Sequence, residues 1–74
     1  MGAENNYRKG QSVRWKWASG HGEGTIAERF DEKVTRTIKG SEITRDGSKD
    51  DPAYLIEQED GARVLKLGSE LEKA

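Results

Sequence analysis

The chain has no cysteine and a single proline, and it is poor in the aliphatic residues that build most protein cores. The absence of cysteine excludes disulfides, thiolate nucleophiles and cysteine-ligated zinc. Leu, Ile, Val and Phe make up twelve of the 74 residues, a fraction that is typical of disordered chains when the net charge is also large. The formal net charge is −1, so we expect one small folded domain with a thin core.

The N-terminus lacks an apolar run. Its first ten residues, MGAENNYRKG, contain neither a signal-peptide core nor a membrane span. We therefore expect a soluble, cytoplasmic, monomeric protein that does not bind membranes.

Charge is unevenly distributed along the chain. Residues 1–22 hold four bases and one acid, a net charge of +3, whereas residues 23–74 hold nine bases and thirteen acids, a net charge of −4. The balance argues against a strongly basic nucleic-acid module and leaves room for a local basic stripe.

Alternation of apolar and polar residues predicts β-strands. In "SVRWKW", Val13, Trp15 and Trp17 share one face, and Arg14 and Lys16 share the other. This segment is expected to be a half-buried strand.

Two further strand segments follow. In "GTIAERF" we expect Ile26 and Phe30 on one face with Glu28 between them. The stretch "VTRTIKGSEIT" reads as a hairpin whose turn is Lys39-Gly40, because glycine readily adopts the positive φ that a tight turn needs.

The last third of the chain predicts a second hairpin after a polar loop, "RDGSKDDP". Asp60-Gly61 separates "AYLIEQ" from "ARVLKL", and both strands are expected to lie centrally because each has apolar residues on both faces. The spacing of Ser69 and Glu72 is that of a capping box, which predicts one helical turn with Leu71 as its apolar contact.

These elements predict an all-β fold, a small SH3-like barrel of five to six short antiparallel strands with a short C-terminal helical turn. Closure into a barrel removes exposed sheet edges. We expect a flexible segment at residues 1–8, the barrel at residues 9–72 and a tail at residues 73–74.

The order of motifs resembles a family found in bacteria and fungi, the Tudor domain of hypervirulence-associated proteins. The resemblance covers roughly Lys9 to Leu71 and includes the Lys9-Gly10 start, the Trp-Lys-Trp strand, the glycine-rich turn, "TRTIKG", "DDPAYLI" and "VLKLGSELE". It implies a Tudor-type barrel, and it implies no particular activity, because no catalytic residues or ligand are established for the family.

The glycine-rich segment "SGHGEGT" is interpreted as a loop that links two strands. A phosphate cradle would need a helix after the glycines, and a strand follows here, with Gly24 expected to mark a bulged entry into it. His21 and Glu23 have His-x-Glu spacing, but the chain has no second histidine and no cysteine to complete a zinc site.

The acids Asp46, Asp50 and Asp51 lack the spacing of a calcium loop. Paired-carboxylate catalysis needs a pocket, and a barrel of this size is filled by its own side chains. We expect no metal, no cofactor and no enzymatic activity.

The two tryptophans are the most informative residues of the chain. Trp15 is interpreted as core, whereas Trp17, beside the glycine-rich segment, is either core or part of a ligand surface. Tudor-type barrels that bind methylated lysine or arginine use a cage of aromatic rings. The resemblance therefore suggests a cage of Trp17, Phe30 and Tyr54 with Glu28 or Asp31 nearby, although Phe30 and Tyr54 also suit a core.

A basic stripe offers an alternative function, the weak binding of single-stranded RNA. Its residues would be Lys9, Arg14, Lys16 and Trp17, since basic and aromatic side chains interleave in single-strand binders. The acidic remainder of the chain opposes this. The interpretation ranked first is a non-enzymatic module that binds a protein or peptide partner through an aromatic-bearing surface of the barrel.

Overall fold

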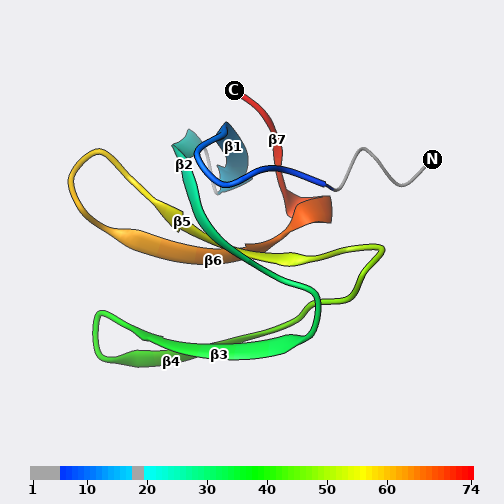
Figure 1. Cartoon of the computed structure of the whole chain (residues 1–74). Coiled ribbons are helices and arrows are strands. Elements are labelled where there is room, and N and C mark those ends of the chain that lie inside the picture. Colours follow the sequence, from blue (N-terminus) through cyan, green and yellow to red (C-terminus); the bar gives the residue numbers. More distant parts are fainter. Residues whose placement is uncertain (1–5, 18–19) are drawn as a thin grey trace.

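The computed structural model describes residues 6–17 and 20–74 (Figure 1). The strands are β1 (Ser12–Trp17), β2 (Gly20–Phe30), β3 (Lys33–Ile38), β4 (Ser41–Asp46), β5 (Ala53–Glu57), β6 (Arg63–Leu67) and the short β7 (Glu72–Lys73). A 3-10 turn, η2 (Gly68–Glu70), precedes β7. The predictions of an all-β fold and of a short C-terminal helical turn are confirmed.

The strands form two antiparallel sheets. The larger sheet has the order β6-β5-β2-β1-β7, and the smaller one is the β3–β4 hairpin. In Figure 1 the hairpin runs below β5 and β6, and β4 lies beside β6. The second sheet thus packs against the first in a small barrel-like fold, as the sequence predicts.

Two apolar clusters lie on opposite faces of β5. Tyr54 and Ile56 point into a cluster with Tyr7, Val13, Trp15, Ile26 and Leu71. Ala53 and Leu55 point into a second cluster with Val34 and Leu65, under the β3–β4 hairpin. Successive side chains of a strand point to opposite faces, so β5 is buried on both sides, and its predicted central position is confirmed.

The same prediction for β6 is wrong, because β6 lies at the end of the larger sheet. Val64 packs on the first cluster, and Leu65 belongs to the second. Among the described strands, β6 is hydrogen-bonded to β5 alone, and β4 of the other sheet packs beside it. Apolar residues on both faces therefore indicate burial here without indicating a central position.

The strand β2 changes face at a bulge. Ile26 is paired with Ile56 and Glu28 with Leu55, so an extra residue of β2 lies between the two pairs. Because such a bulge shifts the alternation by one residue, Ile26 faces the first cluster and Phe30 packs on the second. The prediction that Ile26 and Phe30 share a face is wrong for this reason.

The glycine-rich segment is part of β2, and the prediction of a linking loop over its residues 20–24 is wrong. Each of its glycines lies opposite an apolar residue of β1 in the pairs Trp17↔Gly20, Trp15↔Gly22 and Val13↔Gly24. A Cβ atom on Gly22 would lie 2.4 Å from the Trp15 ring. At Gly24 it would lie 2.5 Å from the Ile56 side chain. These two glycines make room for neighbouring side chains.

Both predicted hairpin turns are present. Lys39 and Gly40 have φ values of 51° and 79°, and Gly61 has a φ of 85°. The Asp60 side chain accepts a hydrogen bond from the backbone N–H of Ala62 at 2.9 Å. The predicted positive φ of Gly61 is confirmed.

Replacing Gly61 by alanine should lower the free energy of unfolding by about 1 kcal/mol, because an L-residue is strained at positive φ. A Cβ on Gly61 meets nothing within 4 Å, so the effect is conformational. Denaturant unfolding measures it. Gly20→Ala is the control, since no described residue lies within 4 Å of a Cβ at Gly20 and Gly20 does not have a positive φ. Equal free energies of unfolding for Gly61→Ala and Gly20→Ala would contradict the positive φ assigned to Gly61.

The polar loop between β4 and β5 has a structural role. The Asp51 carboxylate accepts hydrogen bonds from the backbone N–H and the hydroxyl of Ser69, both at 2.7 Å. The carboxylate of Glu70 accepts one from the backbone N–H of Leu67 at 2.8 Å. The predicted capping box of Ser69 and Glu72 is therefore wrong, since the turn ends at Glu70 and Ser69 binds Asp51.

Tyr7 ties the N-terminal segment to the core. Its ring is 6% exposed and meets the Tyr54 ring edge-on, with 5.6 Å between the ring centroids. Its hydroxyl donates to the carbonyl oxygen of Leu71 at 3.0 Å. Packing thus begins before residue 9, within the segment for which flexibility was expected. Within residues 6–17 and 20–74, no helix is long and apolar enough to cross a bilayer.

Candidate functional site

The strand β1 carries the residues singled out by the sequence. Trp15 is 4% exposed in the first apolar cluster, which confirms its interpretation as core. The backbone of Trp17 pairs with Gly20. Its side chain lies outside the part of the chain that the structure describes, so the choice between core and ligand surface for Trp17 stays a prediction.

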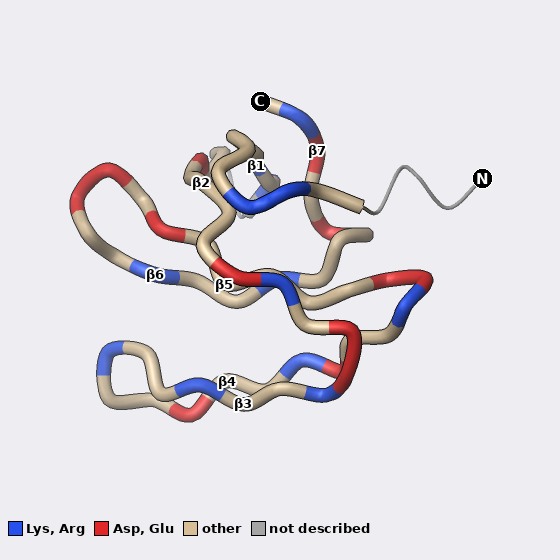
Figure 2. Tube along the Cα trace, viewed as in Figure 1, with Lys and Arg blue, Asp and Glu red and all other residues tan. Residues whose placement is uncertain are grey.

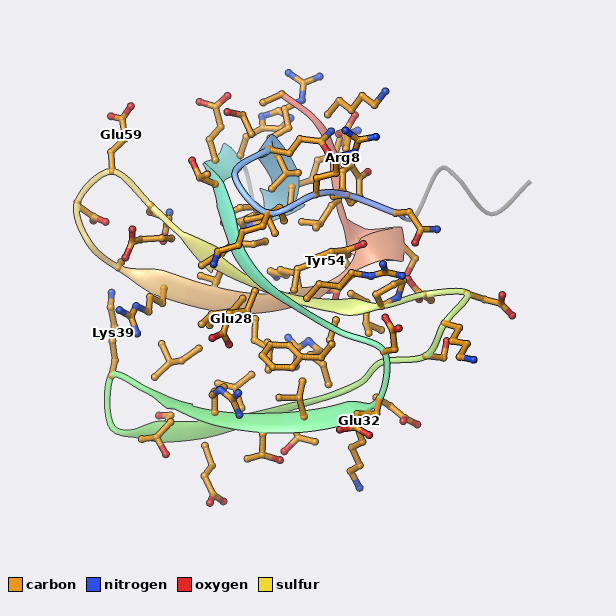
Figure 3. All side chains as sticks on the ribbon, viewed as in Figure 1. Arg8, Glu28, Glu32, Lys39, Tyr54 and Glu59 are labelled. Carbon is orange, nitrogen blue, oxygen red and sulfur yellow. The ribbon has the colours of Figure 1, made fainter. Side chains whose placement is uncertain are left out.

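Tyr54 has no exposed surface. Its hydroxyl accepts a hydrogen bond from the backbone N–H of Tyr7 at 2.8 Å. Figure 3 shows the ring in the interior of the domain. In this conformation Tyr54 supports the N-terminal segment and offers no face to a ligand.

Phe30 lies on the other side of the sheet from Tyr54, packed against the second cluster. The Arg36 guanidinium lies over its ring, 4.7 Å from the centroid, a geometry that gives cation–π attraction. Glu28 forms an ion pair with the same guanidinium at 3.7 Å. Phe30 already has a cation and an acid of this chain beside it.

The structure therefore does not bring Phe30 and Tyr54 together in one cage. The bulge in β2 places Phe30 beside Ala53 and leaves Tyr54 on the opposite face. The other acid considered, Asp31, forms an ion pair with Arg29 at 3.2 Å. Arg36 was missed by the sequence analysis, because its approach to Phe30 depends on how the hairpin folds over the sheet.

The basic stripe is exposed and is mixed with acids. Lys9, Arg14 and Lys16 all have exposed side chains. Arg14 lies opposite Glu23 in the β1–β2 ladder and 3.8 Å from Glu72 of β7. Figure 2 shows residues of both signs on β7 next to the basic strand. The acids lower the positive potential that a phosphate backbone would meet.

The outer edge of β1 is partly open. β7 pairs with β1 at Val13 and Arg14, and the N–H of Ala74 donates to the carbonyl of Ser12 at 3.3 Å. In an antiparallel ladder alternate residues direct both backbone groups to the same side. The N–H and C=O of Lys16 therefore point to the side on which β7 lies, at a position before the first residue of β7, Glu72, where no other described strand is paired.

The described part of the chain offers no set of side chains that could hold a metal. No cluster of three or more His, Cys, Asp or Glu side chains is present there. His21 is exposed and lies opposite Lys16 in the ladder. The outer edge of β1 can therefore provide main-chain hydrogen bonds at Lys16 and exposed charged side chains, and the strand ends at Trp17.

A family model described as "Hypervirulence associated proteins TUDOR domain" matches residues 10–71. Searches of curated proteins and of solved structures gave no match. Tudor-type all-β domains of this size are typically non-catalytic, which indicates a binding module. The match spans most of the chain and agrees with the two-sheet fold described above. The chain therefore belongs to the family of Tudor domains from hypervirulence-associated proteins.

Proposed function

We propose that the domain is a non-enzymatic module that binds an extended segment of a partner protein along the open edge of β1, beside Trp17. The observation that carries the proposal is the start of β7 at Glu72, opposite Arg14, which leaves Lys16 without a paired strand on that side among the described residues. An incoming strand would lie beside Lys16, in line with β7, and would bond to the backbone of Lys16. Addition of a strand to a sheet edge is a common mode of peptide recognition.

The proposal assigns Trp17 to the ligand surface. It places the tryptophan at the end of the open edge, where its ring can contact a side chain of the added strand. Main-chain bonds and an aromatic contact depend weakly on salt, whereas binding through phosphate contacts weakens steeply between about 50 and 200 mM salt. Salt therefore separates this function from binding of single-stranded RNA.

Substitutions at Lys16 test strand addition directly. Proline lacks the N–H and is tolerated on sheet edges. Lys16→Pro should therefore leave the domain folded and abolish binding of a fluorescent peptide of about eight alternating Thr and Val residues, a length typical of strands. Lys16→Ala is the matched control, because it removes the charge and keeps the N–H. We expect fluorescence anisotropy to show unchanged affinity for Lys16→Ala.

Trp17→Ala should keep the thermal midpoint close to that of the parent and weaken binding of the same peptide about tenfold, the loss typical of an aromatic contact residue. If Trp17→Ala does not fold, Trp17 is a core residue and not part of the ligand surface. Equal peptide affinity of the parent and Lys16→Pro would refute strand addition. Tight, salt-sensitive binding of an oligouridine that Lys16→Ala weakens would favour the RNA function.

A further inference from the structure

A second surface lies between the β3–β4 hairpin and β6, away from the open edge of β1. It is a groove of about 340 Å³. In Figure 1 the β3–β4 turn and the β5–β6 turn lie at the same end of the molecule. The residues that line the groove come from these two hairpins. None of the residues predicted from the sequence to bind a ligand lines it.

The floor of the groove is aliphatic. It is formed by Ile38, Ile43, Val64 and Leu65. Leu65 is 2% exposed, whereas the other three are only partly buried. Ile38 and Ile43 pack on the second cluster, whereas the Val64 side chain packs on the first. In a chain with so few aliphatic residues, two partly exposed isoleucines beside one groove form an apolar contact surface.

The rim of the groove is basic. Its charged residues are Lys39, Arg45, Arg63 and Lys66. The acids that pair with them are Glu70, at 3.4 Å and 3.9 Å from Arg45 and Lys66, and Glu57, at 3.8 Å from Arg63. Four cations thus face two acids. Exposed pairs of this kind are weak, so carboxylates of a ligand can replace them.

Lys39 occupies an unusual backbone position at the mouth of the groove. Its φ of 51° lies in the left-handed region, where glycine, asparagine or aspartate is the common choice in a hairpin turn. Figure 3 shows its side chain directed from the hairpin tip toward the layer of β5 and β6. Among the described residues, no acid forms an ion pair with its ammonium group. A strained residue with a free charge beside a groove suggests a functional role.

We propose that this groove binds an acidic, extended protein segment in which an aliphatic side chain alternates with carboxylates. The aliphatic side chain would rest on Ile38 and Ile43, and the carboxylates would meet Lys39 and Lys66. Single-stranded nucleic acid fits less well, since its binders stack bases on aromatic rings and none of the described residues that line this groove is aromatic.

The test uses three fluorescent peptides of about eight residues, a strand length, with alternating Glu and Leu, Glu and Ser, or Lys and Leu. We expect the Glu–Leu peptide to bind and to shift the backbone amide signals of Ile38 to Ile43 and Val64 to Lys66. The Glu–Ser peptide lacks the apolar contact and the Lys–Leu peptide lacks the negative charge, so both should bind far more weakly. The measurement is made in the Lys16→Pro background, which blocks the β1 edge and keeps the two proposals separate.

Lys39→Asn is the decisive variant. Asparagine tolerates positive φ, so the thermal midpoint should stay the same or rise, while affinity for the Glu–Leu peptide falls about threefold, the effect of one exposed charge pair. Lys49→Asn makes the same change of charge on an exposed loop outside the groove and should leave affinity unchanged. Ile43→Thr should weaken binding about fourfold through the loss of apolar contact.

Three results would overturn the proposal. The first is no binding of the Glu–Leu peptide up to about 1 mM, the range of the weakest specific contacts. The second is equal affinity of Lys39→Asn and the parent. The third is a shift of the same amides by an oligouridine at lower concentration than by the peptide, or by dilution of the protein alone, which would assign the groove to RNA or to a second copy of the chain.

Discussion

Trp15→Ala should unfold the domain. The Trp15 side chain is 4% exposed and packs with Val13, Ile26, Tyr54 and Ile56 in the first apolar cluster. Truncation of a buried tryptophan to alanine costs about 3–5 kcal/mol. A domain of this size has roughly the same total stability. No disulfide compensates, because the chain has no cysteine.

Far-UV circular dichroism with thermal unfolding measures this effect. The matched control is Lys16→Ala, next along β1, where the side chain is exposed on the opposite face. The control should change the stability by less than about 0.5 kcal/mol. A Trp15→Ala variant with the thermal midpoint of the parent would show that the first cluster does not hold the fold together.

Gly22→Ala should have the second largest effect. An added Cβ would lie 2.4 to 2.6 Å from three atoms of the Trp15 ring, well inside van der Waals contact. The ring belongs to a packed cluster and has little space into which to move. Overpacking of this kind costs about 1–3 kcal/mol, and we expect a value in the upper half of that range.

Two variants separate the steric effect from other effects of replacing a glycine. Gly20→Ala lies in the same strand, and among the described residues its Cβ would meet nothing within 4 Å, so we expect it to be close to neutral. In the Trp15→Leu background the ring is gone, so Gly22→Ala should cost about 1 kcal/mol less than in the parent, a coupling typical of residues in contact. Denaturant unfolding of the four proteins gives this coupling. Additive effects would contradict the steric explanation.

The glycine-rich segment shows where the sequence was informative and where it was not. The alternation of "SVRWKW" identified β1 and its buried face correctly. The glycines beyond it predict a loop, because the usual signals for a strand are side chains, and here Gly22 and Gly24 lack side chains and so leave room for Trp15 and Ile56. The space that the Trp15 and Ile56 side chains need depends on the tertiary fold, and the local sequence pattern does not predict it.

The proposed aromatic cage illustrates a second limit. Phe30 and Tyr54 were grouped because both are aromatic and both lie on predicted strands. One extra residue between Ile26 and Glu28 sends Phe30 to the opposite side of the sheet. A bulge of one residue leaves little trace in a short strand, so the face of every later residue in β2 was beyond prediction.

Both proposed surfaces depend on pairings that are distant in sequence. The open edge of β1 is defined by the start of β7 at Glu72, near the other end of the chain. The groove is defined by the approach of the β3–β4 hairpin to β6. The turn at Lys39 was predicted, but nothing local indicated that its lysine lies beside an aliphatic groove. Long-range packing therefore created both candidate sites from segments that look ordinary alone.

The central claim is that this Tudor domain binds a peptide at the open edge of β1. The most direct measurement is a titration of the 15N-labelled domain with the neutral Thr–Val peptide, following backbone amide signals at about 50 and 200 mM salt, the range over which phosphate contacts weaken. We expect shifts over residues 14–22 that are similar at both salt concentrations. The claim would be contradicted if the peptide caused no change in these amide signals while an oligouridine caused salt-sensitive shifts.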